Sequence, residues 1–299
     1  MWQQLLEQVS NGDSKALARS ISFVENEQEG YENMLAQLPH SDSSKIIGVT
    51  GPPGAGKSSL TDGLIKEMIA EGKKIAVLCV DPSSPFHLGA LLGDRIRMSE
   101  WYTHPSVFIR SLATRGSMGG LHPKIIEISD LVRAAGYDYI IIETVGVGQS
   151  EIEIVGLADT TVVVMVPEGG DEVQTMKAGL MEIADIFVVN KTDRPGADEF
   201  VKNLRLMLAP AFSTHRNEIP IVKTIALQNI GISELYAAIK KLQSLQLKNE
   251  KRSWLLAERA WQLLQQKRMK GISKQQLAKA IENIPERSFN LYQFVRNLA

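Results

Sequence analysis

The chain has 299 residues, 44% of them hydrophobic, and its 33 Lys and Arg residues nearly balance its 34 Asp and Glu residues. This length can bury the core of one large domain with smaller additions, and the near-zero net charge argues against a general nucleic-acid-binding protein, which usually has a basic excess. The single cysteine, Cys79, lies in an apolar run and excludes a disulfide within the chain, so we expect a cytoplasmic protein.

Residues 1–42 are predicted to form a helical extension. Apolar residues recur at helical spacing on both sides of a break at Asn11-Gly12-Asp13, and polar residues 40–44 have the composition of a linker. The segment lacks the basic start and long apolar core of a signal peptide. No run of the chain approaches the roughly 18 apolar residues of a membrane span. We therefore expect no association with a membrane.

From residue 45 onward, short β-branched runs alternate with longer amphipathic stretches, which predicts an α/β domain over residues 43–243. Alternation of this kind is typical of a mostly parallel sheet flanked by helices. Several runs are apolar without a polar face, as in strands that are buried on both sides. The predicted strands cover residues 45–50, 74–80, 107–110, 138–143, 161–166, 185–190 and 221–225.

Residues 51–58, GPPGAGKS, fit the phosphate-binding pattern G-x-x-x-x-G-K-[ST] at every fixed position. A predicted strand precedes them and a predicted helix over about 57–71 follows, ending at Gly72, which is the context of a P-loop NTPase. Glycines let backbone N–H groups face phosphate oxygens, while Lys57 reaches the β/γ oxygens and the Ser58 hydroxyl suits Mg²⁺. The predicted phosphate-binding residues are Gly51, Gly54, Ala55, Gly56, Lys57, Ser58 and Ser59.

A P-loop also needs a carboxylate from the end of another strand to hold the metal ion. Glu143 ends one apolar run, and Gly146 follows it closely enough for its N–H to approach a γ-phosphate. Asp81 ends another run and opens the turn 81–85, DPSSP. Such residues also serve as plain turn caps, but the upstream P-loop favours the metal site. Asp94, in a polar loop, is a third candidate for the metal.

The four residues Asn190-Lys191-Thr192-Asp193 follow a predicted strand and indicate which nucleotide base is bound. A carboxylate at Asp193 accepts hydrogen bonds from the N1–H and 2-amino groups of guanine, and adenine has neither donor. The sequence therefore predicts GTP, with ATP as the alternative. A later strand end is expected to offer a backbone N–H to the guanine O6. The predicted base-binding residues are Asn190, Lys191, Asp193, Thr224, Ile225 and Ala226.

Three residues are predicted to act in hydrolysis of the nucleotide, and a fourth is a candidate. Lys57 neutralises charge on the β/γ oxygens, and Asp81 is the first candidate for orienting the attacking water. Gln149 is the alternative, because glutamine has this role in other GTPases, although its offset from Gly146 differs. Arg115, in a glycine-rich loop, is a candidate for stabilising transition-state charge when a partner docks.

Beyond about residue 244 the predicted strands stop, and residues 244–299 are expected to be helical. Trp254 and Trp261 recur at helical spacing within residues 248–270, among seven basic and two acidic residues. A dimerisation arm explains this pattern. The alternative is a helix that binds a membrane or RNA, which would make the protein an adaptor GTPase.

Six motifs occur in the same order as in one known family. The chain resembles the P-loop GTPases that are chaperones of adenosylcobalamin-dependent methylmalonyl-CoA mutase (MeaB/ArgK type), formerly described as transport-system kinases. The resemblance is close over about residues 10–245. Its motifs are residues 51–58, 81–85 (DPSSP), 92–98 (LGDRIRM), 115–120 (RGSMGG), 143–151 (ETVGVGQSE) and 190–193 (NKTD).

The resemblance implies a G domain with helical extensions that hydrolyses GTP and dimerises through its C-terminal arm. It implies a mutase partner, methylmalonyl-CoA mutase or a related acyl-CoA mutase, whose cobalamin loading the GTPase gates and protects. The chain shows no cobalamin site of its own, and no nucleic-acid or membrane partner is expected. By position, the resemblance places four residues around Mg²⁺: Ser58, Asp81, Asp94 and Glu143.

Two loops add to this comparison. Residues 167–174 match a loop that senses the partner in this family, whereas residues 86–90, FHLGA, stand where the family usually has glycines. The former family name suggests a small-molecule kinase, which the guanine-selecting residues 190–193 disfavour. A nickel- or zinc-inserting GTPase is disfavoured because the chain has no His-rich or Cys-rich tract.

Overall fold

The computed structural model describes residues 2–39, 43–81, 95–114, 121–146, 152–168, 183–212, 219–245, 250–269, 271–284 and 289–297. By their contacts, the elements divide into two units, Met1–Arg252 and Ser253–Ala299, and each is considered by itself. The boundaries predicted from the sequence, after residues 42 and 243, remain predictions.

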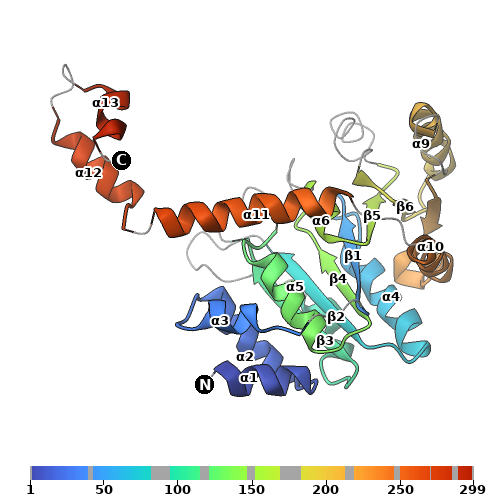
Figure 1. The fold of residues 1–299 in the computed structure, drawn as a ribbon. Helices are drawn as coiled ribbons and strands as arrows, with labels where there is room; N and C mark the ends of the chain where they lie inside the picture. Colours follow the sequence, from blue (N-terminus) through green and yellow to red (C-terminus); the bar gives the residue numbers. More distant parts are fainter. Residues whose placement is uncertain are drawn as a thin grey trace. The chain divides into compact units, whose positions relative to one another are not determined.

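The centre of the first unit is a seven-stranded sheet in the order β3-β2-β4-β1-β5-β6-β7 (Figure 1). Every strand pair is parallel, which confirms the predicted α/β class. The strand order reverses around β1, and in parallel sheets such a switch point is where ligands bind at the carboxyl ends. The strands are β1 (Lys45–Thr50), β2 (Ile75–Asp81), β3 (Val107–Ala113), β4 (Tyr139–Glu143), β5 (Thr160–Met165), β6 (Ile186–Asn190) and β7 (Ile221–Thr224).

Helices cover both faces of this sheet because alternate residues of each strand point to opposite sides. In β1, Ile47 and Val49 belong to a core shared with α4 (Lys57–Ala70) and α10 (Ile232–Ser244). Gly48 faces the other side, where Ile154 of α6 packs against it. The remaining elements of this domain in the described residues are α5 (Ile125–Ala134), α6 (Ile152–Leu157), α9 (Ala197–Phe212) and the 3-10 helices η1 (Arg95–Trp101) and η3 (Ala226–Gln228).

The N-terminal extension is helical, as the sequence predicts: α1 (Trp2–Ser10), α2 (Ser14–Glu25) and α3 (Tyr31–Ala36). Asp13 caps α2, since its carboxylate accepts the N–H groups of Lys15 at 2.8 Å and Ala16 at 3.1 Å. The buried side of α2 includes Leu17 and Ile21, and the helix packs on α1 and α5.

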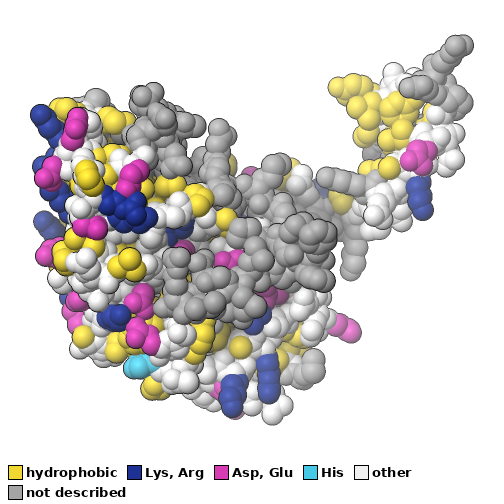
Figure 2. Space-filling model, turned by 180° about the vertical axis from the view of Figure 1, so that it is seen from behind, with side chains coloured by type: hydrophobic (Ala, Val, Ile, Leu, Met, Phe, Trp, Pro, Cys, Tyr) yellow, Lys and Arg dark blue, Asp and Glu magenta, His cyan; other side chains and the backbone are white. Residues whose placement is uncertain are grey.

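The second unit contains most of α11 (Glu250–Arg268), together with α12 (Lys274–Glu282) and α13 (Leu291–Arg296). Hydrophobic side chains gather on its surface (Figure 2). Across the described ranges, none of the helices combines the length and apolar character needed to span a bilayer. The large hydrophobic residues exposed in this unit are Trp254, Leu256, Trp261, Leu264, Met269, Ile272, Leu291, Tyr292 and Val295.

Candidate functional site

The residues predicted to bind the nucleotide meet at the carboxyl edge of the sheet. Parallel strands all end at the same edge, so the ends of β2, β4, β6 and β7 lie beside the loop that follows β1. Glu143 pairs with Cys79, two residues before Asp81, and Asn190 pairs with Thr224. Chain segments that are far apart in sequence thereby form one continuous polar edge.

The P-loop folds so closely against its neighbours that two of its glycines have no room for a side chain. Gly51 has φ 136°, and a Cβ there would lie 2.1 Å from the carbonyl oxygen of Val164. Gly56 has φ 92°, and a Cβ there would lie 2.3 Å from Asn190 Nδ2. Lys57 opens α4, so the predicted helix N-terminus follows the loop directly.

Two hydroxyl groups from the first turns of α4 meet the carboxylate predicted to hold the metal. Ser58 Oγ donates to Glu143 Oε1 at 2.7 Å, and Thr61 Oγ1 donates to Oε2 at 3.4 Å. All three side chains are buried. These oxygen donors fit Mg²⁺, which prefers hard oxygen ligands. Sequence reasoning missed Thr61, although its position one turn after Ser58 is a usable signal.

Asp81 occupies the last position of β2 and is 4% exposed. Its backbone carbonyl accepts the N–H of Thr114 at 3.0 Å, which ties the end of β2 to the residue that follows β3. The position of Asp81 at the same edge as Glu143, on the adjacent strand, is compatible with both roles predicted for it.

Gly146 lies directly against the P-loop. Its φ is 82°, and a Cβ there would lie 2.2 Å from the carbonyl oxygen of Gly51 and 2.5 Å from Lys57 Nζ. The Lys57 Nζ donates to the carbonyl oxygens of Gly51 at 2.9 Å and Pro52 at 3.2 Å. The backbone of Gly146 is therefore next to the amine expected at the β/γ-phosphates.

A pair of threonines, which the sequence did not single out, supports this approach. Thr144 follows β4 and Thr50 ends β1, and their hydroxyl oxygens lie 2.8 Å apart in the interior. The N–H of Thr144 also donates to the carbonyl oxygen of Val49 at 3.0 Å. The segment that leads to Gly146 is thus fixed to the strand that leads to the P-loop.

On the base side, Asn190 is the central residue and is 3% exposed. Its Nδ2 donates to the carbonyl oxygen of Ala55 at 2.8 Å, while its Oδ1 accepts Thr224 Oγ1 and the Ala226 N–H, both at 3.0 Å. One side chain thereby joins the P-loop to both base-binding segments. Asp193 is exposed to solvent beyond it.

Two further contacts shape this region. Lys191 has φ 59°, and its Nζ donates to the carbonyl oxygen of Gly54 at 2.7 Å. The N–H of Ile225 donates to the carbonyl oxygen of Ile230 at 3.0 Å. With the Ala226 N–H held by Asn190, the N–H groups of Ile225 and Ala226 are both used within the protein in this structure.

The turn after β5 also reaches the base-binding segment. Glu168 accepts a hydrogen bond from Arg194 at 2.5 Å, and this contact lowers the pKa of the Glu168 carboxyl below its ordinary value. Several predicted residues lie outside the described part of the chain. They are Asp94, Gln149, Arg115, residues 86–90 and residues 169–174 of the loop 167–174.

Comparison with known proteins accords with this geometry. Residues 17–281 match the family described as methylmalonyl Co-A mutase-associated GTPase MeaB. A Pyrococcus abyssi protein named only as a GTPase is 50% identical over 245 residues, 81% of this chain and 76% of that protein. The GTPase ArgK of Escherichia coli is 37% identical over 244 residues, 78% of this chain and 73% of that protein.

Two other matches concern architecture. A fused isobutyryl-CoA mutase of Geobacillus kaustophilus is 37% identical over 250 residues, which cover 78% of this chain and 23% of that protein. A crystal structure titled LAO/AO transport system kinase superposes with a TM-score of 0.66 at 24% identity, covering 99% of this chain and 96% of that chain. The second likeness shows the P-loop NTPase fold.

Proposed function

The chain belongs to the methylmalonyl-CoA mutase-associated GTPase (MeaB) family, and we propose that it is a cytoplasmic GTPase that loads and protects the cobalamin of an acyl-CoA mutase. The observation that carries the mutase partner is the fused relative. In that protein a segment resembling this chain is one part of a longer polypeptide named as an isobutyryl-CoA mutase. A GTPase joined to a mutase in one chain supports a separate GTPase that acts on a separate mutase.

The buried groups at the carboxyl edge suit phosphoryl transfer, which needs mainly positioning and neutralisation of charge. Ser58 and Glu143 would hold Mg²⁺ together with Asp81 and Asp94, and the ion would supply charge neutralisation at the β/γ oxygens. Lys57 adds a second positive charge there. The N–H of Gly146, whose backbone lies against the P-loop, is assigned to the γ-phosphate.

The attacking water has two candidates for its orienting residue. Asp81 is favoured because it is buried at the same edge of the sheet as Glu143. Gln149 remains the alternative. In Asp81→Asn the carboxylate is lost at nearly constant size, and we expect hydrolysis to fall about 100-fold. Unchanged hydrolysis in this variant, with a loss in Gln149→Ala, would transfer the role to Gln149.

For the base, Asn190 orders the pocket and Lys191 covers it from the side of Gly54. Asp193 then selects guanine through its carboxylate. An Asp193→Asn variant presents an amide donor, which suits the C2 oxygen of xanthine instead of the amino group of guanine. We expect hydrolysis of XTP to replace hydrolysis of GTP, whereas Asp198→Asn, a nearby exposed control, keeps GTP. Retention of GTP preference in Asp193→Asn would remove this assignment.

The second unit is proposed to form a homodimer through its exposed tryptophans. Trp254 is 69% exposed and Trp261 is 58% exposed, and association of two copies would remove both from water. Light scattering of the full chain should give a dimer, and Trp261→Glu should shift the mass to a monomer. A monomeric wild-type chain that binds anionic vesicles or RNA would support the adaptor alternative.

The partner is tested with purified proteins. We expect methylmalonyl-CoA mutase or isobutyryl-CoA mutase to bind the full chain in one nucleotide state, GDP or a non-hydrolysable GTP analogue, and to raise its GTP turnover. A matched sample of Lys57→Ala, which cannot neutralise the phosphates, controls for nucleotide dependence. Failure of both mutases, together with phosphorylation of an amino acid from ATP, would instead establish the kinase.

A further inference from the structure

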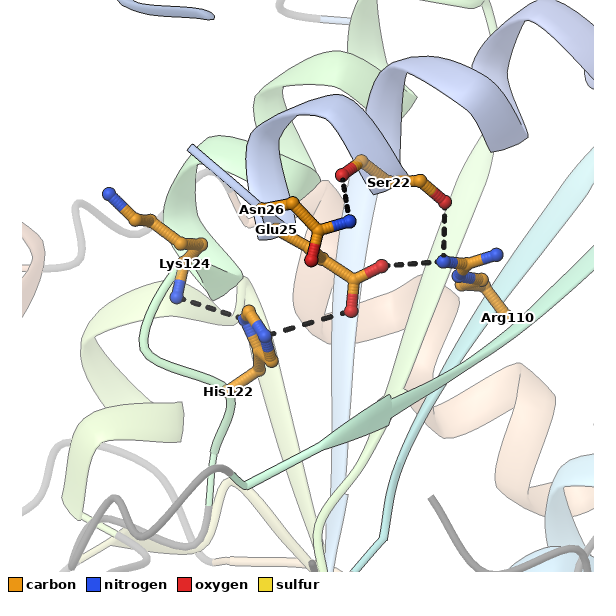
Figure 3. A network of polar contacts seen from close by, with 6 residues as sticks. All are labelled: Ser22, Glu25, Asn26, Arg110, His122 and Lys124. Carbon is orange, nitrogen blue, oxygen red and sulfur yellow. Dashed lines mark hydrogen bonds and ion pairs between the residues drawn. The ribbon is translucent and has the colours of Figure 1, made fainter. Parts of the chain in front are cut away.

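A polar network joins the N-terminal helices to the edge of the GTPase domain (Figure 3). Glu25, at the end of α2, accepts a hydrogen bond from Arg110 Nη2 of β3 at 2.5 Å, and the same nitrogen donates to Ser22 Oγ at 2.9 Å. The other carboxylate oxygen of Glu25 lies 3.7 Å from His122 Nε2. One carboxylate therefore faces two nitrogen donors that come from different segments.

The protonation of His122 follows from its second contact. Its Nδ1 accepts the backbone N–H of Lys124 at 3.0 Å, so the neutral ring carries its proton on Nε2, the nitrogen that faces Glu25. The His122 side chain is only 1% exposed and that of Glu25 is 10% exposed. Attraction between these groups is weakly screened at such burial.

In the sequence, two members of this network stand on either side of residues 115–120. Arg110 is in β3, which precedes these residues, and His122 lies between them and the start of α5. The strand is in register with β2, where Ala113 pairs with Asp81. The N–H of Thr114 donates to the Asp81 carbonyl oxygen at 3.0 Å. Glu25 therefore holds the strand to which the backbone of Asp81 is bonded.

A second carboxylate, two residues after Glu25, makes an ion pair that can be compared with the contacts of Glu25. Glu27 lies 2.8 Å from Lys124 Nζ, but the Glu27 side chain is 57% exposed. Lys124 is itself buried, but its partner carboxylate lies in solvent, where the ion pair is screened and constrains little. The Glu25 carboxylate is 10% exposed and faces two donors, so it constrains both of them, because water replaces a lost contact poorly at such a position.

We propose that Glu25 is a positioning residue for GTP hydrolysis. Through Arg110 and His122 it fixes the two flanks of residues 115–120 and, through β3, the place of Asp81 at the nucleotide edge. The N-terminal extension is then a working part of the GTPase site. This inference needs the GTPase activity of the family and does not depend on the mutase partner.

The test compares Glu25→Gln with Glu27→Gln in the full chain. Glutamine keeps the size of Glu25 and one acceptor for Arg110 but removes the charge that faces two donors. We expect kcat for GTP to fall about tenfold with nucleotide affinity within about twofold, because displacement of positioning groups impairs turnover more than binding. Glu27→Gln, at the carboxylate that lies in solvent, should leave both values unchanged.

Melting temperature and circular dichroism are measured on the same samples. If Glu25→Gln lowers only the melting temperature and hydrolyses GTP at the wild-type rate, the network is structural and the proposal is overturned. If Glu25→Gln is unfolded at the assay temperature, Ser22→Ala decides, since it removes one acceptor of Arg110 and keeps the charge. A fall in kcat of about threefold supports the proposal, and an unchanged kcat overturns it.

Discussion

The two ends of the parallel sheet use polar residues in different ways. At the amino edge, three aspartates each precede a strand and accept the backbone N–H at the start of a neighbouring strand. Asp138 bonds to Lys74 at 2.8 Å, Asp159 to Ile46 at 2.7 Å and Asp185 to Thr161 at 2.7 Å. The same aspartate-to-backbone hydrogen bond thus occurs three times, and each one joins the starts of two neighbouring strands.

At the carboxyl edge, side chains bond to other side chains and to loops. Ser58 and Thr61 meet Glu143, and Asn190 reaches the P-loop. A hydroxyl or carboxylate that bonds to another side chain can exchange this partner for a ligand. A backbone N–H at the start of a strand keeps its partner, because the nucleotide is expected at the opposite edge. Both edges therefore contain stabilising contacts, but the contacts that can be exchanged for a ligand lie at the carboxyl edge.

The largest expected effect comes from matched glycine substitutions at the two edges. Gly146 and Gly136 both have positive φ, 82° and 77°, but a Cβ meets atoms within 2.5 Å only at Gly146 and nothing within 4 Å at Gly136. In Gly146→Ala we expect kcat/KM for GTP to fall more than about 100-fold, because the P-loop and the γ-phosphate donor are forced apart.

In Gly136→Ala the backbone strain should cost about 1 kcal/mol of unfolding free energy and leave hydrolysis unchanged. Steady-state kinetics and urea unfolding of both variants measure the contrast. Equal rates in the two variants would mean that the approach of Gly146 to the P-loop has no role in turnover.

A second contrast uses Asn190→Ala, which leaves the Ala226 N–H and the Ala55 carbonyl without their partner. We expect the unfolding free energy to fall by about 2–3 kcal/mol, since each buried group left unpaired is costly. GTP affinity, measured by titration calorimetry, should fall at least about tenfold because the base pocket and the P-loop lose their link. A loss of stability with unchanged GTP affinity would show that Asn190 has only a structural role.

At the amino edge, Asp159→Ala removes the acceptor for the Ile46 N–H and should lower the unfolding free energy by about 1–2 kcal/mol. Hydrolysis of GTP should stay at the wild-type rate, because the bond is at the far end of β1 from the P-loop. Asp138→Ala is the milder companion, since its partner Lys74 is exposed. A loss of turnover in Asp159→Ala would contradict the separation of the two edges.

The strands of both edges were largely predictable from the sequence. All seven strands were placed within a few residues, because buried parallel strands are apolar runs that local pattern detects. The prediction for β3 stopped at Arg110, three residues early. Arg110 is only partly buried, so the strand tolerates a charged side chain there, and it bonds to Glu25 of the N-terminal helices.

The residue types of the site were also predictable, but their pairing was not. Motifs identify Ser58, Glu143 and Asn190 by chemistry and order. Ser58 and Glu143 are 85 positions apart, and Asn190 is 135 positions from Ala55. Only strand order and register bring such residues together. For the same reason the sequence did not identify Thr144 or the aspartates of the amino edge, whereas Thr61 could have been identified from its position one turn after Ser58.

The smallest expected effect concerns Asp185, whose pKa is raised above 3.8 by burial, although the bond from Thr161 and the charge of Lys251 act in the opposite direction. A carboxyl whose folded-state pKa is raised stabilises the fold below the unfolded pKa and loses this contribution as pH rises through the folded pKa. At pH 7 the ionised Asp185 therefore costs stability.

Asp185→Asn keeps an oxygen for the Thr161 N–H and removes the charge. We expect its unfolding free energy at pH 7 to exceed that of the wild type by about 1 kcal/mol or less, with the advantage shrinking as pH falls toward 3.8. Urea unfolding across this range measures the difference, and a pH-independent difference would refute it. Turnover should not change, since a group that caps a strand can be tuned without disturbing the opposite edge.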